Sequence, residues 1–210
     1  MTDLKGSPVH VASVVAFHQG IHDTYTKLTE ARIAVDAGAH ELDIVLNWPQ
    51  LKKRQYNLIY NELALLRSIA PHPTTLKLIL ETSQLGTRDI LAACTIASAA
   101  NFDFVKTSTG FVGHGATEQH VRLMRAACEY LASQRPDGWK MRVKASGGIR
   151  TVEDAVRMLQ AGADRLGSSG GVWIVKEGRD SAARGESPVS LGHKRNNSRP
   201  GMTTRLFTDY

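Results

Sequence analysis

The sequence predicts an α/β protein with a parallel sheet, because short apolar runs alternate with segments of helical periodicity. Six runs have the composition of buried strands: residues 9–17, 40–48, 75–82, 102–109, 141–148 and 163–171. Successive runs start 22 to 39 residues apart, a spacing typical of repeated strand–helix units. Largely apolar strands indicate a sheet that is buried between covering helices.

The segments between these runs have the features of helices. Apolar residues recur three or four positions apart in three sets: Leu28, Ala31 and Val35; Ile59, Leu63 and Leu66; and Val121, Met124, Cys128 and Leu131. Thr151–Asp154 is close to a capping box, with Thr151 as the N-cap residue. Gly38 and Gly162 stand where helices should end, because glycine readily adopts the left-handed conformation of a helix cap.

A (β/α) barrel is the leading architecture, and an open doubly wound sheet is the alternative. No G-x-G-x-x-G motif follows the first run, which weighs against a dinucleotide-binding fold. Only about six of the eight βα units of a closed barrel are evident. We expect one N-terminally short barrel domain over residues 1–180. The basic segment 181–210 has the composition of a disordered tail.

Composition indicates a soluble globular protein. The 210 residues are 42% hydrophobic, and no stretch approaches the roughly 18 apolar residues of a membrane span. The net charge is +6, and half of this excess lies in the last 35 residues, with seven Lys/Arg against four Asp/Glu. Because aromatic residues do not interleave with these charges, we expect neither nucleic acid nor a membrane as partner. The oligomeric state stays open, a homo-oligomer included.

The two cysteines and the histidines do not form metal-binding patterns. Cys94 and Cys128 lie in predicted helices without metal-ligand spacing, and we interpret them as small buried hydrophobic residues in a reducing compartment, hence the cytoplasm. A redox pair is the alternative. His18, His114 and His120 also lack metal-ligand spacing.

Two lysines end two consecutive apolar runs. Lys106 lies in "FVKTSTGF" and Lys144 in "RVKASGGIR", at matching depths, so they should be neighbours on strands about 4.8 Å apart. Two ammonium groups about 5 Å apart repel by roughly 3 kcal/mol at an effective dielectric near 20, which would lower one pKa from about 10.4 towards 8. Such a lysine can attack a carbonyl and form a Schiff base. A salt-bridged lysine is the alternative.

Other polar residues stand at the same ends of the predicted strands, where parallel α/β folds place their functional sites. Asp43 interrupts the apolar run "ELDIV", where its carboxylate could stabilise the ammonium charges and assist proton transfer, or simply form a buried ion pair. Further candidates at these ends are Asn47, Glu81, Arg150, Ser168 and Ser169.

Glycine-containing loops follow the last three runs: "STGF", "SGGIR" and "GSSGG". Glycine lets backbone N–H groups approach an oxyanion closely, and serine adds hydroxyl donors. Barrels often bind phosphate with the loops after their last strands. The three loops together therefore favour a phosphorylated ligand, and Arg150 could assist or could pair with Glu153 or Asp154.

At the two lysine motifs the sequence resembles the deoxyribose-phosphate aldolases, class I aldolases with a TIM-barrel fold. "ELDIVLN", "KLILET" and "GADRLGSSGG" resemble further blocks of this family in the same order, so that the resemblance covers about residues 5–175. It implies reversible cleavage of 2-deoxy-D-ribose 5-phosphate to D-glyceraldehyde 3-phosphate and acetaldehyde, with a sugar phosphate as small-molecule partner and no metal or organic cofactor.

The resemblance also implies roles for individual residues. Lys106 would form the Schiff base, while Lys144 would perturb its pKa and shuttle protons together with Asp43. The residues expected to hold the phosphate are Gly110, Gly147, Gly148, Ser168 and Ser169. Family members usually have two further strands before the run at Val9, so we expect this chain to lack them. The alternative function is an inactive truncated barrel that binds a sugar phosphate or a full-length homologue.

Overall fold

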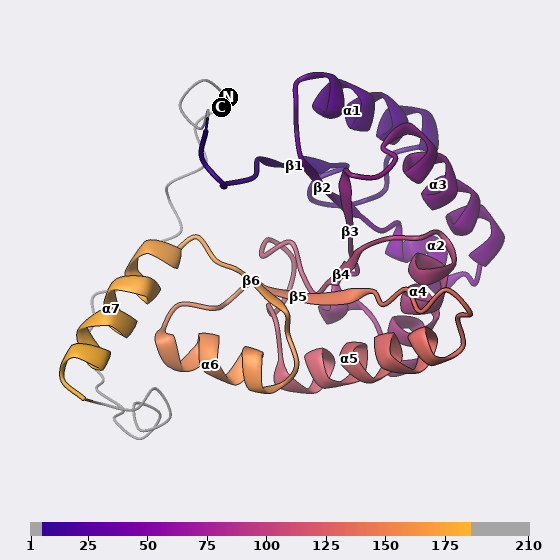
Figure 1. Ribbon diagram of the computed structural model, residues 1–210. Coiled ribbons are helices and arrows are strands. Elements are labelled where there is room, and N and C mark those ends of the chain that lie inside the picture. Colours follow the sequence, from indigo (N-terminus) through magenta and orange to yellow (C-terminus); the bar gives the residue numbers. More distant parts are fainter. Residues whose placement is uncertain (1–5, 186–210) are drawn as a thin grey trace.

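The computed structural model describes residues 6–185 and contains one sheet of six parallel strands. The strands are β1 (Ala12–Val15), β2 (Glu41–Val45), β3 (Thr75–Ile79), β4 (Phe104–Lys106), β5 (Arg142–Ser146) and β6 (Arg165–Gly167). Each strand lies within one of the six predicted runs and pairs with its neighbours in chain order. The sheet curls into a half-barrel (Figure 1), so the predicted partial TIM barrel is confirmed.

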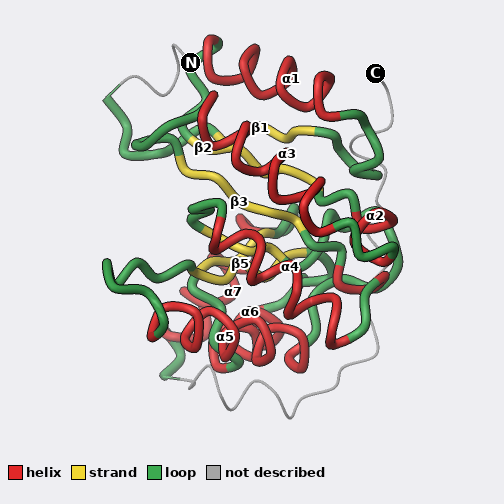
Figure 2. Tube along the Cα trace, turned by 90° about the vertical axis from the view of Figure 1, so that its right-hand side faces the viewer, coloured by secondary structure: helices red, strands yellow, loops and turns green. Residues whose placement is uncertain are grey.

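Helices connect the strands and follow the outer side of the curved sheet (Figures 1 and 2). They are α1 (Thr24–Asp36), α2 (Trp48–Lys52), α3 (Tyr56–Ile69), α4 (Thr87–Ala99), α5 (Glu118–Ser133), α6 (Val152–Gln160) and α7 (Gly171–Ala183), with a short 3₁₀ turn η2 (Thr82–Gln84) after β3. Helices α1 and α7 lie at opposite ends of the arc. None of the helices in residues 6–185 is long and apolar enough to cross a membrane.

Helix α7 ends at Ala183, three residues beyond the expected domain boundary at residue 180. Residues 186–210, which make up most of the predicted tail, lie outside the described residues. The boundary and the character of the tail therefore remain predictions.

The predicted helix boundaries at Thr151, Gly38 and Gly162 are confirmed. The Thr151 side chain accepts a hydrogen bond from the backbone N–H of Asp154, and the Asp154 side chain accepts one in return from the backbone of Thr151. Gly38 and Gly162 follow the ends of α1 and α6 with φ angles of 91° and 106°. Gly162 also packs against Arg125, where an added Cβ would lie 2.8 Å from the arginine side chain.

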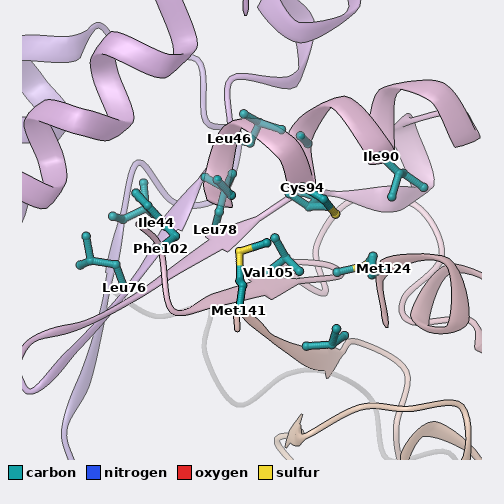
Figure 3. Close-up of a cluster of buried hydrophobic side chains, with 14 of the residues drawn as sticks. Ile44, Leu46, Leu76, Leu78, Ile90, Cys94, Phe102, Val105, Met124 and Met141 are labelled. Atoms are coloured by element: carbon teal, nitrogen blue, oxygen red, sulfur yellow. The ribbon is translucent and has the colours of Figure 1, made fainter. Parts of the chain in front are cut away.

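The two faces of the sheet have opposite chemistry. Leu42, Ile44, Leu76 and Leu78 belong to the hydrophobic core between sheet and helices, part of which is shown in Figure 3. The residues between them in sequence, such as Asp43 and Lys77, lie on the inner face and bind one another. Because successive side chains of a strand point to opposite faces, the same strands build the apolar core and a charged interior.

A buried ion pair joins α1 to α3 outside this interior. The ammonium group of Lys27, a fully buried residue, lies 2.6 Å from Glu62 Oε1 and donates to the carbonyl oxygen of Val45 at 3.2 Å. The hydroxyl group of Thr24 donates to Glu62 Oε2 at 2.9 Å. Burial lowers the pKa of Lys27, and the charge of Glu62 opposes that effect.

Removing one partner of this pair should destabilise the fold more than removing both. Glu62→Ala leaves a buried ammonium group without its counter-charge, so we expect the free energy of unfolding to fall by about 3–5 kcal/mol. In the double variant Lys27→Met/Glu62→Leu both charges are absent, and most of that loss should be recovered. Urea denaturation followed by circular dichroism measures both values, and equal losses in the two variants would contradict the prediction.

Candidate active site

Three lysines of the inner face converge on one carboxylate. Lys77 donates to Asp43 Oδ1 at 2.7 Å, while Lys106 and Lys144 donate to Asp43 Oδ2 at 2.7 and 2.8 Å. Asp43 is 4% exposed and Lys77 is fully buried. Lys106 and Lys144 keep side-chain exposures of 10% and 13%, so a small part of each side chain is accessible to solvent.

The strand register brings these residues together. In the parallel ladder Asp43 lies opposite Lys77, and Lys106 lies opposite Lys144. The two lysines are therefore neighbours, as their matching depth in the sequence predicts. Asp43 comes from two strands away from Lys106, and the curvature of the sheet brings its carboxylate to both amines.

The charges of the cluster change its acid–base properties. Burial by itself raises the pKa of Asp43, but the charges of Lys106, Lys144 and Lys77 outweigh burial and hold that pKa well below its ordinary value. Burial also lowers the pKa of Lys144, and the like charge of Lys106 adds to the effect, against the attraction of Asp43. Asp43 thus stays ionised at neutral pH, and Lys144 gives up its proton more readily than an ordinary lysine.

A second layer of charged residues, which the sequence did not predict, lies beneath this cluster. Lys77 also contacts Glu41 Oε2 at 2.5 Å, and Arg165 contacts the same oxygen at 2.6 Å. The aromatic ring of Phe104 lies under the guanidinium groups of Arg142 and Arg165, 4.2 and 4.8 Å from its centroid. The available signal was the two-residue spacing of Glu41 and Asp43, which puts both carboxylates on one face of β2.

Two of the three glycine-containing loops touch. Gly110, Gly147 and Gly148 have φ angles of 90°, 87° and 78°, a backbone region that favours glycine. A Cβ added at Gly147 would lie 3.4 Å from the Cα atom of Gly110 and 3.0 Å from that of Gly115. The loops after β4 and β5 therefore pack backbone against backbone.

The loop after β6 joins them through Ser168. Its hydroxyl group donates to the carbonyl oxygen of Ile149 at 2.6 Å and accepts from the backbone N–H of Gly170 at 3.0 Å. Ser169 is exposed. All the residues predicted to hold a phosphate thus lie on loops at the carboxyl ends of β4, β5 and β6.

Two other candidates lie at the starts of helices. Asn47 accepts a hydrogen bond from the backbone N–H of Gln50 at 3.2 Å and caps α2. Arg150 is exposed, and its backbone N–H donates to Asp154 Oδ2 at 3.0 Å at the start of α6. The structure therefore does not bring Asn47 or Arg150 into the lysine cluster.

Removing the carboxylate of Asp43 should destabilise the protein in a pH-dependent way. Asp43→Asn leaves three ammonium groups without their shared counter-charge, so we expect the free energy of unfolding at pH 7 to fall by about 3–5 kcal/mol. Because the folded pKa of Asp43 lies below its unfolded value of about 3.9, its contribution is complete above that pH and declines as the pH falls further.

Urea denaturation across a pH series measures this difference. The gap between wild type and Asp43→Asn should begin to shrink below about pH 4. Asp36→Asn, which removes an exposed carboxylate at the end of α1, serves as the matched control and should show no comparable loss. A gap that stays constant down to about pH 3 would contradict a depressed pKa at Asp43.

Comparison with known proteins agrees with the fold. Residues 2–179 match the DeoC/LacD family aldolase profile. A deoxyribose-phosphate aldolase from Coccidioides immitis (strain RS) is 48% identical over 176 residues, which make up 84% of this chain and 63% of that protein. The chain therefore spans less than two thirds of the length of this curated relative.

Solved structures show the same relationship. The crystal structure of a Coccidioides immitis protein matches with a TM-score of 0.79 and 46% identity, over 85% of this chain and 68% of that one. The deoxyribose phosphate aldolase from Aeropyrum pernix, described as tetrameric, matches with a TM-score of 0.73 and 30% identity, over 85% and 71% of the two chains. This protein belongs to the DeoC/LacD family of aldolases.

Proposed function

We propose that this protein is a class I aldolase, a lyase that reversibly cleaves 2-deoxy-D-ribose 5-phosphate to D-glyceraldehyde 3-phosphate and acetaldehyde. The observation that carries the proposal is the convergence of Lys106 and Lys144 on Asp43. It occurs in a chain that is 43–48% identical to proteins named deoxyribose-phosphate aldolase. These relatives favour an active enzyme over the inactive barrel that the sequence left open.

Lys106 is the proposed nucleophile. Its neutral amine attacks the aldehyde carbon of the open-chain sugar, and loss of water gives a protonated Schiff base. Once the Schiff base has formed, its cationic iminium group faces the carboxylate of Asp43, which bound the ammonium group before the reaction. A fixed negative charge beside the iminium group stabilises it, which supports Asp43 as an electrostatic anchor.

Cleavage requires proton transfers next to this group. The hydroxyl on C3 of the sugar loses its proton, the C2–C3 bond breaks, and glyceraldehyde 3-phosphate leaves. The C2–C3 electron pair moves towards the iminium nitrogen and forms an enamine, which is protonated at C2, and water then releases acetaldehyde from Lys106. The lowered pKa of Lys144 makes it a better proton donor than an ordinary lysine, and Asp43 orients its amine.

The charge of the inner face favours an anionic substrate. Its carboxylates, Glu41 and Asp43, are outnumbered by the cations that contact them: Lys77, Lys106, Lys144 and Arg165. We assign phosphate binding to the loops that carry Gly110, Gly147, Gly148, Ser168 and Ser169, because glycine backbones with positive φ can turn N–H groups towards an oxyanion.

Location and assembly follow as part of the same proposal. Cys94 and Cys128 are buried and form no disulfide, which supports a reducing compartment such as the cytoplasm. The Aeropyrum pernix relative is described as tetrameric, which supports a homo-oligomer for this chain as well. We predict neither nucleic acid nor a membrane as a partner.

Borohydride trapping with acetaldehyde tests the nucleophile directly. Reduction of the Schiff base should leave a stable adduct on Lys106, located by peptide mass spectrometry. Lys106→Ala should lose the adduct and reduce retro-aldol turnover by at least about 10³-fold, because the covalent intermediate cannot form. Lys140→Ala, which removes a surface lysine, is the matched control and should behave as wild type.

The outcomes separate the two candidate functions. An adduct on Lys106 together with acetaldehyde release supports the aldolase. A compact, folded protein without an adduct would favour the inactive binding barrel. Full turnover in Lys106→Ala would show that the Schiff base forms elsewhere or not at all.

A further inference from the structure

Glu81 has an unusual backbone conformation at the carboxyl end of β3. Its φ and ψ angles are 55° and 61°, in the left-handed region, and the residue is fully buried. A residue with a long side chain rarely adopts this conformation, and such strain persists only where the surrounding structure imposes it. The aldolase mechanism above gives Glu81 no role, so its position requires another explanation.

The carboxylate of Glu81 holds the loop that follows β4. Its Oε2 atom accepts hydrogen bonds from both the backbone N–H and the hydroxyl group of Thr109, at 3.1 and 2.6 Å. The Thr109 hydroxyl group in turn accepts from the backbone N–H of Phe111 at 3.1 Å. One carboxylate oxygen therefore sets the geometry of residues 109–111, which include Gly110.

The other carboxylate oxygen, Oε1, is buried and has no hydrogen-bond partner within residues 6–185. Glu81 also forms no ion pair with a residue in that part of the chain. A buried carboxylate that is only half satisfied is costly for folding. An apolar residue would stabilise the fold at lower cost, so stability alone does not account for a glutamate here.

The residues after Glu81 bind the same loop. The backbone N–H of Thr82 donates to the carbonyl oxygen of Thr107 at 2.9 Å, and the hydroxyl group of Ser83 donates to that of Val112 at 3.1 Å. A Cβ added at Gly113 would lie 2.6 Å from Ser83 Oγ. Residues 81–83 thus form a clamp, which we call the β3 clamp, along residues 107–113.

The clamped loop contacts the next phosphate-binding candidate. The backbone N–H of Ala116 donates to the carbonyl oxygen of Gly147 at 3.0 Å. A Cβ added at Gly115 would overlap that same oxygen. The contacts therefore run from Glu81 through Thr109 to Gly110 and Gly147. Within residues 6–185 the side chains of Asp43 and of the lysines that bind it form no hydrogen bond with Glu81 or Thr109.

We propose that Glu81 is a positioning residue that sets the loop after β4 for the phosphate-bearing part of the substrate. This inference rests on the proposed function. Glu81 acts through Thr109 on the Gly110 and Gly147 backbones and leaves Schiff-base chemistry at Lys106 unaffected. Loss of its carboxylate should therefore weaken recognition of the sugar phosphate more than reaction with a small aldehyde that carries no phosphate.

Two substitutions at Glu81 separate the carboxylate from the backbone strain. Glu81→Gly removes the carboxylate but adopts the left-handed conformation without strain. Glu81→Gln keeps an oxygen that can accept from Thr109. Glu129→Ala, which removes a half-exposed carboxylate on α5, is the matched control.

Each variant is assayed twice. Steady-state cleavage of the sugar phosphate gives kcat and KM, and borohydride trapping with acetaldehyde gives the rate of Schiff-base formation. For Glu81→Gly we expect KM to rise about tenfold or more, as for a lost charge-assisted hydrogen bond, while acetaldehyde trapping on Lys106 stays within about twofold of wild type. Glu81→Gln should bring KM most of the way back to the wild-type value, and Glu129→Ala should match wild type in both assays.

Unchanged KM in Glu81→Gly, or an equal loss of substrate affinity and acetaldehyde trapping, would overturn the proposal. If Glu81→Gly does not fold by circular dichroism, Thr109→Val replaces it, because valine removes the hydroxyl donor while keeping the side-chain shape. A raised KM with normal trapping in Thr109→Val then supports the positioning role, and an unchanged KM contradicts it. Absence of a Lys106 adduct in the wild type would instead contradict the aldolase function itself.

Discussion

The interior of this protein depends on the carboxylate of Asp43. Three ammonium groups bind it within 2.8 Å, and without it their mutual repulsion would be concentrated in a largely buried space. At such distances each attraction is several kcal/mol even at an effective dielectric near 20, which is enough to offset much of the desolvation of the charges. The same attraction keeps Lys106 and Lys144 side by side, where the chemistry of a Schiff base becomes available.

The Asp43 cluster exists because the sheet is parallel and in a specific register. In this register Asp43 lies opposite Lys77 and Lys106 lies opposite Lys144, so all four side chains lie on the inner face. Ile44, Leu78 and Val105 belong to the hydrophobic core on the other face, towards the helices. A shift of one residue in any strand would exchange the two faces, burying charge among aliphatic side chains. Core packing and site geometry therefore depend on the same alternation and cannot vary independently.

The loops at the carboxyl ends of the strands add a second level of organisation. Gly110 and Gly147 have positive φ angles and no side chains, so their two backbones approach each other closely. The β3 clamp binds the loop after β4 at Thr109 and Val112 and so fixes this arrangement. The charged cluster is thus built from strands, whereas the surface around it is built from backbone contacts between loops. This division separates the groups proposed to react from those proposed to bind phosphate.

The sequence alone predicted the features that depend on residues close together in the chain. The six strands, their parallel arrangement and the helix ends at Gly38, Thr151 and Gly162 follow from periodicity and from the conformational preferences of single residues. The sequence also predicted that Lys106 and Lys144 are neighbours, because residues at equal depth on adjacent parallel strands must lie close together. The roles of Lys106, Lys144 and Asp43 and of the phosphate-binding residues remain predictions.

Tertiary structure decided the contacts between residues distant in the chain. Glu41 and Lys77 looked like ordinary strand residues, and only the register shows that Lys77 links the two carboxylates of β2. Asn47 and Arg150 had the right position in sequence, but Asn47 caps α2 and the side chain of Arg150 is exposed, since the direction of a side chain after a strand depends on the turn that follows. Glu81 was one polar residue among several until its left-handed backbone and its contact with Thr109 were known. Local sequence specifies which face a residue takes, but the pairing of side chains across the sheet is set by curvature and loop packing, which depend on the whole fold.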